Sequence, residues 1–138
     1  MAARRIPPGG TRGTVYRELA RLRLKDAICL LGEGRYNRCI YLAGYAIECH
    51  LKFAICERKD HYYLPAKLEV HDWDRLVTAA GLLADIKKQK RMAGVYFSLV
   101  DHWGTTLRYR TTMYRANQAE GLFKQMNELY VFFKELVP

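Results

Sequence analysis

The sequence lacks the features that mark membrane, secreted and metal-binding proteins. No uncharged run in its 138 residues exceeds about nine residues, which is far short of a membrane span. The arginines near the N-terminus are not followed by an apolar segment, so we expect no secretory signal. The four cysteines lack the paired short spacing of a zinc site. We therefore expect a cytoplasmic protein that needs no metal or cofactor and does not contact a membrane.

The cysteines also argue against a disulfide framework. Such frameworks are typical of small secreted chains with little core, whereas half of this chain is hydrophobic. Cys29, Cys39, Cys49 and Cys56 all fall within apolar helical patterns. We expect all four to be free thiols that fill core volume.

Positive charge is in excess and is unevenly distributed. The formal net charge is +9, yet residues 60–86 contain more acidic than basic residues. The basic residues gather in 1–25, in the KKQKR run at 87–91 and between Arg108 and Arg115. Such clusters favour an anionic partner, either a nucleic acid or a phosphate-rich ligand. A solvated surface that keeps the protein soluble explains the same charge, and the sequence leaves both interpretations open.

The stretch 34–59, GRYNRCIYLAGYAIECHLKFAICERK, is apolar around most of a helix and predicts a helix buried on several sides. Its narrow polar stripe contains Asn37, Tyr41, Glu48 and Lys52, which recur at helical spacing. Glu48 precedes Lys52 by one turn, the favourable orientation for an ion pair. We expect a structural pair there, with ligand positioning as the alternative.

The remaining pattern predicts one helical domain behind a flexible basic arm at residues 1–13. Asp72 is a candidate N-cap for a short helix that Gly81 interrupts. Long or medium amphipathic helices are expected at 14–31, 83–103 and 115–136. Together with the central helix they predict an all-α, up-and-down antiparallel bundle of four main helices and one short helix over residues 14–138.

Several of these segments resemble one known family. AGYAIECHLK at 43–52 is the most specific of them, followed by Leu64-Pro65, HDWDRLVTAAGL from His71, and W…LRY ending at Tyr109. In this order they resemble the HEPN family (higher eukaryotes and prokaryotes nucleotide-binding domain). The resemblance implies a helical homodimer that binds RNA or nucleotide phosphates. It also implies a toxin–antitoxin or defence component whose partner is a nucleotidyltransferase.

Catalytic HEPN proteins carry an Arg followed after four to six residues by a His, a pair suited to metal-independent RNA cleavage. This chain departs from that pattern. None of its four histidines has an arginine at the required spacing, and neither Arg108 nor Arg110 is followed by a His there.

The candidate residues therefore come from the region where the resemblance places a dimer cleft. Phosphate contacts are expected from Arg108, Arg110 and Arg115, with Tyr109 as a stacking face and with contributions from Glu48 and Lys52. A second hypothesis is a ribonuclease with a non-standard site, in which the catalytic residues are Arg108, Arg110, His102 and Tyr114. A third is a non-catalytic module that docks another protein.

Overall fold

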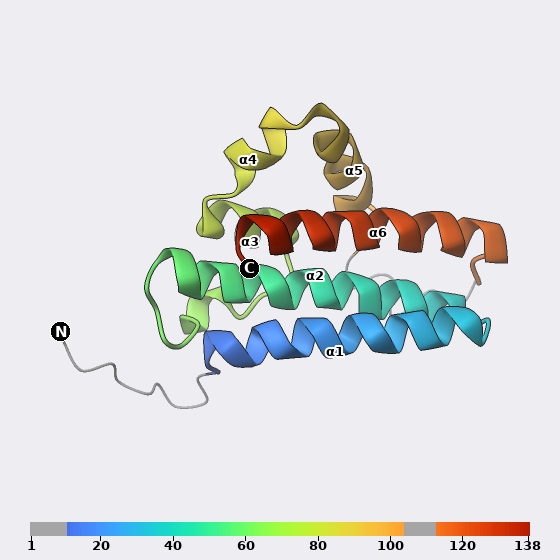
Figure 1. Cartoon of the computed structure of the whole chain (residues 1–138), viewed down its shortest axis with the longest axis horizontal. Coiled ribbons are helices and arrows are strands. Elements are labelled where there is room, and N and C mark those ends of the chain that lie inside the picture. The colour runs from blue at the N-terminus through green and yellow to red at the C-terminus, as the bar shows by residue number, and fades with distance from the viewer. Residues whose placement is uncertain (1–10, 104–112) are drawn as a thin grey trace.

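The computed structural model describes residues 11–103 and 113–138, and within these ranges the protein is all-helical (Figure 1). The predicted Arg108, Tyr109 and Arg110 lie outside the described residues. The helices, with one 3₁₀ turn at Ala66–Leu68, are α1 (Gly13–Gly32), α2 (Tyr36–Arg58), α3 (Trp73–Ala80), α4 (Leu83–Lys88), α5 (Lys90–Val100) and α6 (Ala116–Leu136).

Helix α2 is the core of the protein, as its apolar circumference predicts. It lies between α1 and α6, and every residue from Ala46 to Cys56 is buried (Figure 1). Gly34 takes a positive φ of 74° in the short turn that returns α2 antiparallel to α1. By length and hydropathy α2 would also qualify as a membrane span. However, 83% of the qualifying window is buried inside the protein, as in the core helix of many soluble proteins.

The direction of α6 differs from the expected up-and-down order. Tyr114, just before α6, bonds to Asn37 at the start of α2, and Val137, just after α6, bonds to His50 farther along α2. The two helices therefore run in the same direction, which Figure 1 also shows. The physical reason is that α3, α4 and α5 carry the chain back to the starting end of α2 before α6 begins.

The single helix expected over 83–103 is divided into α4 and α5. The break is at Gln89, whose φ of −108° and ψ of 100° are extended rather than helical. Its amide donates to the carbonyl of Ile86 at the end of α4, and its carbonyl accepts from the amide of Ala93 in the first turn of α5. Gln89 therefore caps the backbone of both helices. The four cations of KKQKR surround this residue, and their mutual repulsion disfavours a continuous helix there.

Two local predictions for α3 are confirmed. The Asp72 side chain caps its N-terminus by accepting from the amides of Asp74, at 3.0 Å, and Arg75. Gly81 ends the helix in the left-handed conformation, with φ of 71°. The part of the expected arm that the structure describes, 11–13, is held by two backbone hydrogen bonds to Tyr62 and Leu64.

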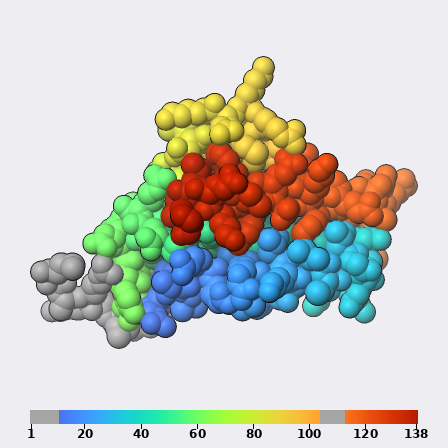
Figure 2. Space-filling model, viewed as in Figure 1, coloured from blue at the N-terminus to red at the C-terminus, as the bar shows by residue number. Residues whose placement is uncertain are grey.

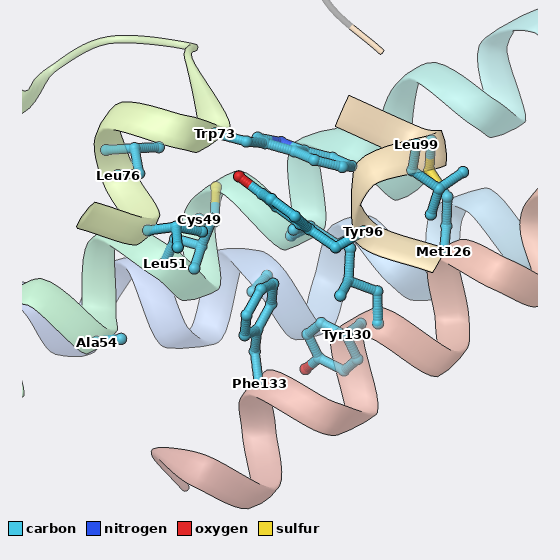
Figure 3. Close-up of a cluster of buried hydrophobic side chains, with 14 of the residues drawn as sticks. Cys49, Leu51, Ala54, Trp73, Leu76, Tyr96, Leu99, Met126, Tyr130 and Phe133 are labelled. Carbon is cyan, nitrogen blue, oxygen red and sulfur yellow. The ribbon is translucent and has the colours of Figure 1, made fainter. Parts of the chain in front are cut away.

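Aromatic side chains join α3 and α5 to the core. The Trp73 ring stacks on Trp103 and on Tyr96, with centroids 5.1 and 6.4 Å apart, and Figure 3 shows Trp73 and Tyr96 lying face to face. The Tyr96 hydroxyl also donates to Asp74. These contacts fix the α3–α5 layer against α2.

The cysteine prediction is correct for three of the four residues. All four are free, and Cys39, Cys49 and Cys56 are buried, but Cys29 is exposed. Cys29 follows Arg21 and Lys25 at four-residue steps, so it continues the charged outer face of α1 rather than the inner one.

Candidate functional site

Two residues predicted as catalytic, His102 and Tyr114, are brought together by the fold. The Tyr114 hydroxyl lies 2.8 Å from His102 Nε2, within hydrogen-bond distance. The Tyr114 backbone amide donates to Asn37 Oδ1, also at 2.8 Å. The chain on either side of 104–112 is therefore anchored at one place, beside the first turn of α2. Asn37 was predicted as part of the polar stripe, but its partner was not.

Trp103 holds His102 in position. Its indole N–H donates to the Tyr41 carbonyl at 3.2 Å, and its ring packs so closely on α2 that a Cβ at Gly44 would lie 1.8 Å from the indole nitrogen. Tyr41, the second residue of the polar stripe, also stacks on this ring at 6.3 Å. The sequence gives no signal for the contact between Trp103 and Gly44. The apolar periodicity predicts a helix through Gly44 and does not indicate that another residue packs against it.

Two exposed arginines lie next in sequence to the residues of this anchor. Arg115 is exposed immediately before α6, where the first free amides of the helix add partial positive charge. Arg38 is exposed next to Asn37 on α2 and was not among the predicted site residues. Neither guanidinium forms an ion pair with another described residue, and a guanidinium group suits bidentate contact with a phosphate.

Glu48 and Lys52 form the predicted ion pair, and it is buried. Lys52 Nζ lies 3.0 Å from Glu48 Oε2, and Glu48 is 0% exposed. The other carboxylate oxygen, Oε1, lies 2.9 Å from His71 Nδ1, a contact that the sequence did not indicate. Lys52 also lies over the Tyr16 ring, 5.5 Å from its centroid. Both carboxylate oxygens thus have cationic or N–H partners, which favours a structural role.

The residues of the predicted polar stripe contact two separate regions of the protein. Glu48 follows Asn37 by 11 positions on α2, which puts them roughly 16 Å apart along the helix. His102, Tyr114 and Arg115 are near Asn37, whereas Glu48 and Lys52 are near the start of α3. Within the described residues, Glu48 and Lys52 therefore do not share a cleft with Arg115.

Comparisons with family models, with characterised proteins and with solved structures find no match to this chain.

Proposed function

We propose that this chain is a HEPN-like cytoplasmic protein that, as a homodimer, binds RNA or nucleotide phosphates. The proposed site is the basic region that begins at the His102–Tyr114 contact. The proposal includes the role that the resemblance implies, a toxin–antitoxin or defence component that pairs with a nucleotidyltransferase.

The observation that carries the proposal is the 2.8 Å contact between His102 and Tyr114. It anchors both flanks of the chain segment that contains Arg108 and Arg110, and it does so beside the exposed Arg115 and Arg38. Arg108 and Arg110 lie in the sequence between the two residues of this contact. Guanidinium groups match phosphate oxygens in charge and geometry, and an adjacent tyrosine offers a face on which a base stacks.

The experiment measures RNA binding by two variants. One loses two positive charges at the proposed site, and the other loses two positive charges elsewhere on the surface. The test variant is Arg108→Ala combined with Arg110→Ala, and the matched control is Lys59→Ala combined with Lys67→Ala, two exposed lysines outside the basic clusters. We expect the first pair to weaken binding of single-stranded RNA and to reduce its salt dependence, while the second leaves both unchanged. Equal losses in both variants would show diffuse attraction to a basic protein instead of a site.

Light scattering tests the dimer directly. A mass of about twice 16.1 kDa is expected for the full chain. A monomer would contradict the homodimer. Salt-insensitive binding of a protein partner, with no affinity for RNA or nucleotide, would instead favour the interaction module.

The same contact supports a second candidate, a metal-independent ribonuclease. A histidine paired with a tyrosine hydroxyl has the groups needed to accept the proton of a ribose 2′-hydroxyl and to donate a proton to the departing 5′-oxygen, while an arginine stabilises the phosphorane. Incubation of mixed RNA with a chelator present tests this directly. Cleavage should be lost in His102→Ala and reduced in Tyr114→Phe. Cleavage that persists in His102→Ala and in the double arginine variant would exclude these residues as catalytic.

A further inference from the structure

A pocket lies where the last turns of α6 meet α1, two segments that lie side by side in Figure 2. Its volume is about 260 Å³. It shares no residue with the region around His102 and Tyr114. The lining residues are Arg17, Glu18 and Arg21 from α1, His50 from α2, Tyr130 and Lys134 from α6, and Pro138.

The lining contains more positive than negative charge. Glu18 is its one acidic side chain, and Arg21 donates two hydrogen bonds to it, at 3.1 and 2.5 Å. Arg17 and Lys134 form no ion pair within the described part of the chain, and the Arg17 guanidinium lies 5.1 Å from the Phe53 ring centroid. Within the described residues, these two cations therefore remain available to an anionic ligand.

His50 contributes a buried polar atom that lacks a partner. The side chain is 1% exposed, and Nε2 lies 2.9 Å from the Val137 carbonyl. A carbonyl only accepts, so Nε2 carries the proton and Nδ1 of the neutral ring is an acceptor. Nδ1 has no hydrogen-bond partner among the described residues. Burial lowers the pKa of His50, and the charges of Lys134 and Arg17 lower it further, which favours this neutral form.

We propose that this pocket binds a phosphate monoester, with its anionic oxygens on Arg17 and Lys134 and its protonated oxygen donating to Nδ1 of His50. A phosphate monoester suits the site because its second pKa is about 6, so one P–OH group is readily present near neutral pH. A sulfate ester has the same shape but no such proton. Arg17 and Lys134 are exposed, and their long side chains can follow an anion into the pocket that His50 lines.

The experiment uses two probes of similar shape, of which only the phosphate ester can carry a proton on an anionic oxygen near neutral pH. Phenyl phosphate and phenyl sulfate are titrated separately into the full chain near pH 6.5, with calorimetry for affinity and nitrogen NMR for the His50 ring. We expect phenyl phosphate to bind at least about tenfold more tightly, since one hydrogen bond to a buried acceptor is made by phosphate alone. The His50 Nδ1 resonance should shift with phosphate only.

Variants locate the site. Arg17→Ala and Lys134→Ala should each weaken phenyl phosphate binding about tenfold or more. The controls remove an exposed lysine from the same helices outside the pocket, Lys25→Ala on α1 and Lys124→Ala on α6, and should bind as the unmodified chain does. Circular dichroism checks that each variant is folded.

Equal affinity for the two probes, or a His50 resonance that does not move, would overturn the proposal. So would equal losses in the pocket and control variants. The inference is independent of the proposed function, because it uses no residue of the RNA site and no dimer. Loss of RNA binding in the Arg108 and Arg110 variant would leave phenyl phosphate binding intact.

Discussion

The indole of Trp103 lies where a side chain at Gly44 would be, since a Cβ there would come within 1.8 Å of the indole nitrogen. This close approach lets the ring reach the Tyr41 carbonyl on the same helix and stack on Trp73. A glycine in the middle of the core helix costs roughly 0.5–1 kcal/mol relative to alanine. Here that cost is offset by the contact that anchors His102.

Gly44→Ala should therefore destabilise the protein, although alanine is the better helix former. We expect a loss of roughly 1–3 kcal/mol or more in the free energy of unfolding, because the added methyl forces the buried indole to move. Gly94→Ala is the matched control, since Gly94 is exposed in α5 and has open space around it. It should stabilise the chain by up to about 1 kcal/mol. Denaturant unfolding measures both, and similar effects at the two sites would contradict this account.

Lys52→Met should be strongly destabilising, because it leaves the fully buried Glu48 carboxylate without its ion-pair partner. Removing one member of a buried pair typically costs about 3–5 kcal/mol. Lys59→Met, at the exposed end of α2, provides the comparison and should change the unfolding free energy by less than about 0.5 kcal/mol. If the double variant Glu48→Gln with Lys52→Met recovers none of the stability lost in Lys52→Met, the loss has another cause.

His50 should make the protein less stable as the solution becomes more acidic. Its pKa in the folded state is lowered, chiefly by burial, so the unfolded chain binds the proton more readily. The stability from neutral His50 is complete above the unfolded pKa of about 6.5 and is lost as pH falls from there toward the folded pKa. One such group contributes a slope of at most about 1.4 kcal/mol per pH unit.

Unfolding free energies measured from pH 5 to 8 check this dependence. His50→Gln should have a shallower slope in that range than the unmodified chain. His61→Gln removes an exposed histidine and should keep the original slope. An unchanged slope in His50→Gln would rule out His50 as its source.

One thiol of the four should react readily with a thiol reagent in the folded protein. Cys29 is exposed, whereas Cys39, Cys49 and Cys56 are buried. Burial raises the pKa of the Cys39 and Cys56 thiols to about 11 and that of Cys49 to about 12, so their reactive thiolates are scarce.

Ellman's reagent should therefore titrate one equivalent in native protein and four after unfolding. Cys29→Ala should abolish the fast native reaction. A second rapidly reacting thiol in that variant would show that the core around α2 opens more readily than the burial indicates.

Much of the local structure could be predicted because helical periodicity and capping act over neighbouring residues. The apolar circumference of α2, the Asp72 cap and the Gly81 stop each depend on residues within one or two turns. The break at Gln89 was missed because the pattern of apolar residues continues through it, and only the repulsion among the flanking cations marks the place. The exposure of Cys29 was missed because the charged outer face of α1 includes a residue type that is more often buried.

The site could be predicted only in part. The Glu48–Lys52 pair was predictable from a four-residue spacing, but the third partner, His71, is 23 residues from Glu48. His102 and Tyr114 were chosen separately, and nothing in their spacing required that they touch. RNA binding, the dimer and the nucleotidyltransferase partner stay predictions.

The amino-acid sequence by itself determined that the chain is helical, where most helices begin and end, and that 34–59 is the core, because these properties follow from interactions between near neighbours. The tertiary structure alone decided that α6 runs parallel to α2, that His102 meets Tyr114, and that His50 reaches Val137, 87 residues away. Such contacts depend on how far α3, α4 and α5 carry the chain across the molecule, and local spacing does not specify that path.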